Sequence, residues 1–247
     1  MNDAKVTVSS RLSYGGLRCG ISAAVSLRAQ KALATFLGVA VVGVLIGVYV
    51  TFLTGGPTPY RVPVAAAAGG PSANLTLQTV AAVGPKLSPN ENWVSYLVRE
   101  HGVWHRSTVW TLPAHALVHV TVYQFDGKSG LRNPFLSQAR GIEGGAFTLN
   151  GKSMSTINPD DASHTFAIPQ LGVLVPLEGV DDNAKNQCDF APCSLSNAHN
   201  TITFTFRTGK KGHYRWQCFV PCAAGFYYGF GGPMQTIGYM DGFVNVV

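Results

Sequence analysis

A run of 22 residues without a charge, from Ala32 to Leu53, constrains this chain more than any other feature. At about 1.5 Å per residue, a helix of this length spans the roughly 30 Å hydrocarbon core of a bilayer. A cleaved signal peptide is the alternative, since the small-residue stretch PVAAAAGG follows. The apolar part of a signal peptide is only about 7 to 15 residues long, however. The run is therefore predicted to be a transmembrane signal-anchor helix.

Charges around this run predict its orientation. The net charge is +6, and residues 1–31 hold five of the 18 basic residues and one of the 12 acidic residues. Positive charge before an apolar run and none soon after it is typical of a cytoplasmic N-terminus. Residues 1–31 are thus predicted to be cytoplasmic, and the large remainder to lie outside the cell (plasma) membrane. That remainder has no basic stripe interleaved with aromatic residues, so we expect no nucleic-acid partner.

The exported part alternates like a β protein. Residues 54–74 are rich in Gly, Pro and Ala and are predicted to be a flexible linker to a domain at 75–247. The clearest strand is AHALVHVTVYQFD, in which Val118, Val120 and Val122 share one face. GGAFTLNG is predicted to be a hairpin arm that turns at Asn150-Gly151.

Two further segments complete this interpretation. NTITFTFRTGKKGHYRWQC, residues 200–218, is predicted to form a β-hairpin, whereas residues 90–110 fit either a helix or strands. Short strands separated by Gly and Pro turns, with no second convincing helix, predict an antiparallel β-sandwich.

The cysteines agree with export. Cys19 lies in the predicted cytoplasmic segment, and the other four cysteines lie in the exported part. Four cysteines in an oxidising compartment first suggest two disulfides. Cys188 and Cys193 are the first and last residues of CDFAPC, which lies in a polar stretch, 178–200, that is predicted to be an inserted loop. They could staple this loop or pair less locally; we predict a Cys188–Cys193 disulfide that leaves the other pair free.

Three segments carry candidate metal ligands. DASHTFAIPQLGV places His164 before a strand, GHYRWQC leads into Cys218 with Cys222 four residues later, and YMDGFVNVV places Met240 before a terminal strand. The patterns D-x-x-H-x-F-x-I-P-x-L-G-V and Q-C-x-x-x-C resemble the cupredoxin superfamily, and most closely the CuA domain of cytochrome c oxidase subunit II, over residues 111–247. The resemblance implies an all-β, cupredoxin-like antiparallel Greek-key β-sandwich on a single N-terminal transmembrane helix.

The resemblance also implies copper as the cofactor. Thiolate sulfur and imidazole suit both oxidation states of copper, and a weakly bound thioether tunes the potential. The implied ligands are His164 for nitrogen, Cys218 and Cys222 for thiolate sulfur, and Met240 as the weak axial ligand. Val220, between the two cysteines, would lend its backbone carbonyl.

The chain departs from the family at the second histidine ligand. Its position falls on Phe226, or on Ile237 if the loop is lengthened. His213 is excluded because it lies about 16 Å from Cys218 along one strand, at about 3.3 Å per residue, and faces the other way. The remaining histidines are predicted to lie on the surface or to reach the site only through tertiary contacts: His101, His105, His115, His119 and His199.

The function expected from these features is a membrane-anchored copper-binding electron-transfer protein, a subunit or partner of a membrane oxidase complex. Its partners would be other subunits, a redox protein donor and, through Ala32–Leu53, the lipid bilayer. No nucleophile–base pair or spaced acid pair predicts a catalytic site in the chain itself. The alternative is a copper-free structural or assembly subunit of a membrane oxidase or copper monooxygenase complex, in which Cys218 and Cys222 are oxidised to a disulfide or idle.

Overall fold

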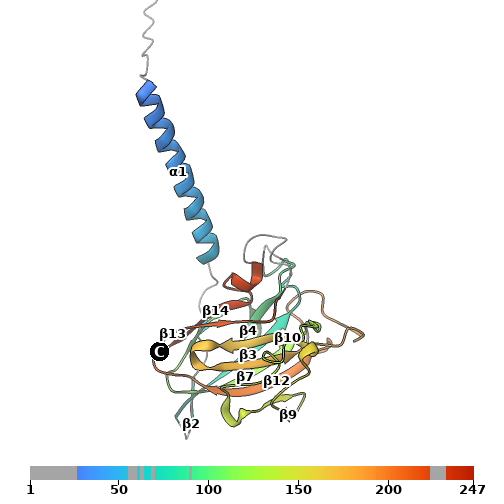
Figure 1. The fold of residues 1–247 in the computed structure, drawn as a ribbon. Coiled ribbons are helices and arrows are strands. Elements are labelled where there is room, and N and C mark those ends of the chain that lie inside the picture. Colours follow the sequence, from blue (N-terminus) through green and yellow to red (C-terminus); the bar gives the residue numbers. More distant parts are fainter. Residues whose placement is uncertain (1–26, 55–59, 62–63, 68–69, 89–90, 223–231) are drawn as a thin grey trace, which may run out of the picture. The chain divides into compact units, whose positions relative to one another are not determined.

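The computed structural model describes residues 27–54, 60–61, 64–67, 70–88, 91–222 and 232–247 (Figure 1). The chain divides into two compact units, Met1–Val48 and Tyr49–Val247. Each unit is described separately.

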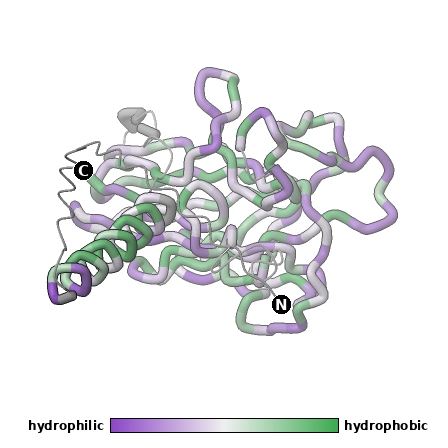
Figure 2. The backbone as a smooth tube through the Cα atoms, turned by 90° about the horizontal axis from the view of Figure 1, so that it is seen from above, coloured by the Kyte–Doolittle hydropathy of each residue, from purple (hydrophilic) through white to green (hydrophobic). Residues whose placement is uncertain are grey.

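A single long helix, α1 (Leu27–Thr54), accounts for the described part of the first unit and extends into the second. The 24 residues Arg28–Thr51 form a candidate membrane span that contains an 18-residue window of mean hydropathy 2.5, and all of their side chains are exposed. Figure 2 shows this helix as hydrophobic along most of its length. A helix that is apolar all round suits a lipid environment better than water. The predicted helix at 32–53 is confirmed as a candidate membrane span, and the helix begins five residues earlier.

The second unit is a β-sandwich of two sheets. The first sheet has six strands in the order β1-β6-β14-β13-β10-β11. Their bounds are β1 Tyr60–Arg61, β6 Val109–Leu112, β14 Asp241–Val246, β13 Gly212–Gln217, β10 Ala162–Ile168 and β11 Val173–Glu178. The strands β13, β10 and β11 run antiparallel to their neighbours in this row, whereas β6 pairs parallel with both β1 and β14.

The second sheet has eight strands in the order β5-β4-β3-β7-β12-β8-β9, with β2 paired to β3. Their bounds are β2 Val64–Ala67, β3 Gly70–Val80, β4 Ser95–Glu100, β5 Val103–His105, β7 Leu117–Gln124, β8 Phe147–Leu149, β9 Lys152–Met154 and β12 Asn200–Arg207. Short 3-10 turns connect some strands: η1 Glu143–Gly145, η2 Pro159–Asp161, η3 Pro169–Leu171 and η4 Gly232–Gln235.

Aromatic rings fill the core between the sheets. Trp110 of β6 stacks on Trp216 of β13 with ring centroids 4.7 Å apart, and Tyr96 of β4 meets the same indole edge-on at 4.8 Å. Phe166 of β10 continues the stack at 6.0 Å from Trp110. All four side chains are fully buried. Because offset and edge-on ring pairs are stabilising beyond their buried area, this stack fixes β13 and β10 relative to each other.

The predicted fold class, a β-sandwich behind one apolar helix, is confirmed. The alternating strand at 114–126 is β7, with its three valines buried, and Asn150-Gly151 turns β8 into β9 with positive φ at both residues. The ambiguous segment 90–110 forms strands β4, β5 and the start of β6. In the segment predicted to be an inserted loop, the structure describes every residue from the end of β11 to the start of β12 and has no strand or helix between them.

One predicted strand pairing was wrong. Residues 200–218 are not a hairpin, because β12 pairs with β7 and β8 while β13 pairs with β14 and β10 in the other sheet. Thr208 ties the crossing to the β6–β7 connection: its hydroxyl donates to Pro113 O at 2.6 Å and accepts from Ala116 N at 2.8 Å. Phe206 of β12 and Trp216 of β13 thus pack in one core from opposite sheets.

The predicted linker at 54–74 was too long. β1 and β2 fall inside it, and β3 begins at Gly70. β3 is also the main departure from an antiparallel arrangement, since it runs parallel to β7 from Ser72 to Thr79. NLTLQTV, residues 74–80, alternates like a strand, but the Gly, Pro and Ala composition before it hid the first residues of β3, whose pairing is set by distant partners and not by local propensity.

Candidate metal centre

The candidate ligands gather where strands of the first sheet begin and end. His164 lies near the start of β10, Cys218 directly follows β13, and Met240 directly precedes β14. β10 and β13 pair antiparallel with Ala167 opposite Gln217, so the chain that continues past β13 runs back alongside β10 toward His164. Sequence segments more than 50 residues apart therefore meet at this one end of the sandwich.

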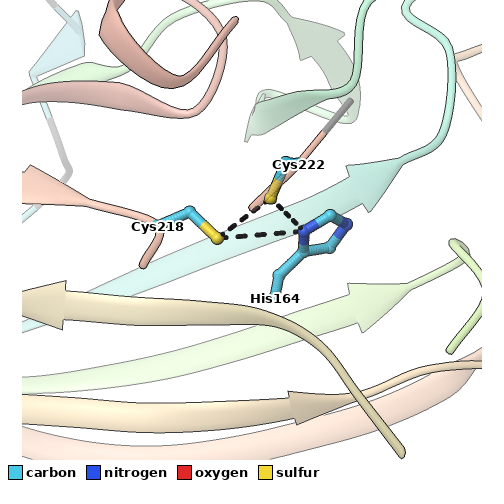
Figure 3. A group of neighbouring side chains, drawn as sticks. All are labelled: His164, Cys218 and Cys222. Carbon is cyan, nitrogen blue, oxygen red and sulfur yellow. Dashed lines mark hydrogen bonds between the residues drawn. The ribbon is translucent and has the colours of Figure 1, made fainter. Parts of the chain in front are cut away.

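His164, Cys218 and Cys222 form one buried cluster whose ligand atoms all lie within 4.8 Å of one another. The Nδ1 atom of His164 lies 3.0 Å from the Sγ of Cys222 and 3.9 Å from the Sγ of Cys218, as Figure 3 shows. The two sulfurs are 3.2 Å apart and both thiols are free. A disulfide bond measures only about 2.05 Å. In this structure the pair is therefore reduced and converges with one ring nitrogen.

Backbone groups complete the surroundings of the sulfurs. The Thr165 amide donates to the Sγ of Cys218 at 3.4 Å. The carbonyl oxygen of Val220 accepts from Cys222 at 2.9 Å and lies 3.5 Å from the Sγ of Cys218. The Thr165 hydroxyl accepts from Phe219 N at 2.8 Å, which anchors the turn between the cysteines to β10. The Val220 carbonyl is thus directed at both sulfurs, where the resemblance expects a backbone ligand.

The other ring nitrogen of His164 has a partner that the sequence did not reveal. Its Nε2 atom lies 3.0 Å from the Oδ2 of Asp126, two residues beyond the end of β7. Asp126 ends the strand segment AHALVHVTVYQFD and precedes a glycine, which is an ordinary turn pattern. Only the three-dimensional structure distinguishes this aspartate from a simple turn residue.

Buried charge interactions perturb every titratable group of the cluster. Burial lowers the pKa of His164, but the carboxylate of Asp126 and the sulfur of Cys218 outweigh it and raise the pKa to about 9. Burial raises the pKa of Cys218, but its contacts with Cys222 and His164 lower that pKa well below the usual value. Burial and the neighbouring Cys218 sulfur raise the pKa of Cys222 well above its usual value. The metal-free cluster thus favours one thiolate, one thiol and an imidazolium.

The predicted axial ligand shares this core. Met240 is fully buried, packs in the same hydrophobic cluster as both cysteines, and accepts a hydrogen bond from Cys218 N through its carbonyl at 3.0 Å. The backbone contact places residue 240 beside the cysteine turn. A role for its thioether stays a prediction.

The other six histidines lie elsewhere. His119 is exposed on β7 and bonds to Thr205, and exposed His213 stacks on Phe243. His199 packs against Tyr123 and Phe125. His101, His105 and His115 are exposed. Among the described residues, the cluster of potential ligands therefore contains a single imidazole.

The second cysteine pair is separate from this cluster. Cys188 and Cys193 form a disulfide within the inserted loop, the pairing predicted from the sequence. Gln78 of β3 joins the loop to the sandwich, since its side chain accepts from Cys193 N at 2.8 Å and donates to Cys193 O at 3.3 Å. The loop is therefore fastened without using the cysteines of the cluster.

The chemistry of the donor set fits a soft metal ion. One imidazole nitrogen, two sulfurs and a carbonyl converge in a buried site, and soft sulfur ligands select Cu(I) and Zn(II) over hard cations. The donor set therefore fits a site with one nitrogen ligand, whereas the resemblance implies two nitrogen ligands for a pair of copper ions.

No protein-family model matches the chain, and no curated protein sequence matches it. Solved structures do. Reduced rusticyanin is 16% identical over 71% of this chain and 79% of its own, with a TM-score of 0.28. Rusticyanin from Thiobacillus ferrooxidans is 16% identical over 71% of this chain and 77% of its own, with a TM-score of 0.26. A chain of a heme-copper terminal oxidase dimer is 11% identical over 88% of this chain and 99% of its own, with a TM-score of 0.28. At such values, the fold assignment rests on the two sheets themselves.

Proposed function

We propose that this chain is a membrane-anchored copper-binding protein that transfers electrons, as a subunit or partner of a membrane oxidase complex. The observation that carries the proposal is the buried cluster of His164, Cys218 and Cys222, with both thiols free and all ligand atoms within 4.8 Å. The oxidase context rests on the sequence resemblance around His164 and Cys218. The candidate membrane span supports attachment to a bilayer.

The surrounding fold suits an electron-transfer site. Copper, when bound, would supply a one-electron couple between Cu(I) and Cu(II). His164 stands on β10, and Cys218 and Met240 directly adjoin β13 and β14. These ligands and Cys222 are 4% exposed or less, so water is excluded and little has to reorganise when charge changes. Phe219, directly after Cys218, is 41% exposed and connects the cluster covalently to the molecular surface. A redox partner that contacts Phe219 would lie one residue from a ligand.

The donor count favours one copper ion. With one imidazole and two sulfurs, a single soft Cu(I) is better satisfied than a pair of ions, of which one would lack a nitrogen ligand. We propose His164, Cys218 and Cys222 as the principal ligands, with Val220 O and the thioether of Met240 as weak ones. The N-terminal segment would lie in the cytoplasm and the sandwich outside it.

A copper-free structural or assembly subunit is the second candidate. It is favoured by one observation: in the described part of the chain, every buried side-chain nitrogen and oxygen already has a hydrogen-bond partner without a metal. In that case the sandwich would supply an interface to a membrane oxidase or copper monooxygenase complex.

Copper titration of the full-length chain separates the two candidates. The protein is purified in detergent under reducing, copper-free conditions and titrated with Cu(I) against a chromophoric chelator. The expected result is one Cu(I) per chain, with binding lost in His164→Ala and kept in the control His119→Ala, which removes an exposed histidine. Two results together would establish the copper-free candidate instead. The reduced wild-type protein would take up no copper, and a sample purified without reductant would contain a Cys218–Cys222 disulfide.

A further inference from the structure

We infer that Asp126 is the positioning residue of this site: its carboxylate orients the ring of His164 so that Nδ1 faces the two sulfurs. The inference rests on the proposed copper function and adds a residue from the turn after β7, a strand of the second sheet, to a site otherwise built around strands of the first. Nothing in the sequence patterns around Asp126 distinguishes it from a turn residue.

The two nitrogens of one ring carry the first part of the argument. His164 is 2% exposed, and its Nδ1 and Nε2 atoms each have a partner at 3.0 Å, the Sγ of Cys222 and the Oδ2 of Asp126. An ionised carboxylate can only accept hydrogen bonds. Metal binding requires the neutral ring, and the proton of that ring is therefore on Nε2, with the lone pair of Nδ1 directed at the sulfurs. A metal held by both sulfurs would meet that lone pair.

The carboxylate is itself fixed in place. Its second oxygen, Oδ1, accepts from the amide of Gly127 at 2.7 Å. The backbone of Asp126 is bonded on both sides, since its carbonyl accepts from Val180 N at 2.9 Å and its amide donates to the side chain of Gln124 at 3.3 Å. A carboxylate with both oxygens engaged and its backbone anchored has little freedom to rotate. Asp126 is therefore a fixed reference against which the imidazole is aligned.

Metal-bound histidines depend on such partners. A carboxylate that accepts from the distal N–H fixes the tautomer, orients the ring and makes the bound nitrogen more basic, and loss of the partner typically weakens metal binding about 10- to 100-fold. Here the dependence is sharper because the described ligand cluster contains one imidazole. A ring flip about the Cβ–Cγ bond would direct Nδ1 and its lone pair away from the sulfurs.

The geometry also distinguishes this contact from an ordinary ion pair. The Asp126 side chain is 28% exposed, whereas the ring it meets is buried at the side facing the sulfurs. The carboxylate thus lies between solvent and the cluster, on the outer side of the ligand.

The test compares three variants of the full-length chain in detergent. Asp126→Ala removes the carboxylate, and Asp126→Asn keeps its size and an oxygen for Gly127 N. Asp160→Asn is the matched control, since Asp160 is a surface carboxylate whose ion-pair partner is Arg132, at 3.7 Å. Cu(I) affinity is measured by chelator competition, and circular dichroism confirms that each variant is folded. Proton–nitrogen correlation spectra of the diamagnetic Cu(I) protein, with labelled histidine, report the His164 tautomer.

Asp126→Ala is expected to weaken Cu(I) binding about 10- to 100-fold and Asp126→Asn by less, with no change in Asp160→Asn. The wild-type spectrum should show a slowly exchanging proton on Nε2 of His164, and this signal should be lost in Asp126→Ala. If the wild type binds Cu(I) and both Asp126 variants keep its affinity and spectrum, the positioning role is refuted while the copper function stands. If the reduced wild type binds no Cu(I), the copper function fails, and this inference fails with it.

Discussion

Replacing Gly242 by alanine tests whether the fold brings β14 as close to the core as the structure shows. A Cβ atom at this position would lie 1.9 Å from the carbonyl oxygen of Thr108 and 2.5 Å from the indole nitrogen of Trp216. These two atoms are themselves hydrogen-bonded at 2.7 Å, and the same carbonyl also accepts from Phe243 N at 3.0 Å. The methyl group would therefore displace a backbone carbonyl that has two donors.

The magnitude follows from what must move. β14 lies between β13 and β6 and pairs with both, so it cannot shift outward without disturbing two sets of strand hydrogen bonds. Overpacking of a filled core costs ~1–3 kcal/mol, and loss of one hydrogen bond costs ~0.5–1.5 kcal/mol. We expect Gly242→Ala to destabilise the sandwich by about 2–4 kcal/mol. For a domain of this size that corresponds to a fall in Tm of roughly 5–15 °C.

The assay is thermal unfolding of the full-length chain in detergent, followed by near-ultraviolet circular dichroism of the stacked tryptophans. Gly127→Ala is the control, because its Cβ would meet nothing closer than Asp182 at 3.6 Å. Since Met240 lies two residues before Gly242 and bonds to Cys218 N, Cu(I) affinity should fall together with Tm. Since each kcal/mol lowers the Tm by at least about 2 °C, the smallest expected destabilisation, about 2 kcal/mol, lowers it by about 4 °C. A Tm within about one degree of the wild type would refute the close approach of β14 to Thr108 and Trp216.

Three further outcomes are expected. Protease added outside intact cells or spheroplasts should cut within residues 56–247 and spare residues 1–31; equal protection of both segments would overturn the predicted orientation. Met240→Leu should weaken Cu(I) binding in chelator competition without abolishing it, because a thioether is a weak ligand; a complete loss would make it a principal one. Burial raises the pKa of Glu178, and the nearby charge of Asp161 raises it further. The contribution of Glu178 to folding stability is therefore fully present below pH ~4 and is lost as the pH rises through the pKa of the folded state. Glu178→Gln should therefore raise Tm at pH 7 but not at pH ~4, and a gain confined to acid would contradict this sign.

The strands that could be predicted from the sequence were those whose local pattern matches their environment. β7 alternates valines with polar residues because one of its faces packs on the core, and the turn after β8 is specified by Asn150-Gly151. The same reliance on local pattern gave the wrong prediction for residues 200–218. Two alternating stretches around TGKKG have the pattern of a hairpin, but the partners of β12 and β13 lie in different sheets. Local pattern shows that a strand exists and leaves its neighbour undetermined.

The candidate site divides in the same way. His164, Cys218 and Cys222 could be predicted because their residue types and spacing follow a known ligand pattern, and the structure brings them together. Asp126 could not, because its contact with His164 joins residues 38 apart, one on β10 of the first sheet and one just after β7 of the second. The polar shell of a metal site is set by packing between elements, so sequence spacing carries little information about it.

The missing histidine decides what kind of centre this chain can form alone. All seven histidines lie in the described residues, and only His164 belongs to the ligand cluster. His199, which the sequence predicts to reach the site only through tertiary contacts, packs instead against Tyr123 and Phe125 from the end of the inserted loop. A centre with two imidazole ligands would therefore need a histidine that the arrangement of these seven does not supply. One soft ion between two thiolates and one imidazole needs none, and it is the occupant that this site satisfies by itself.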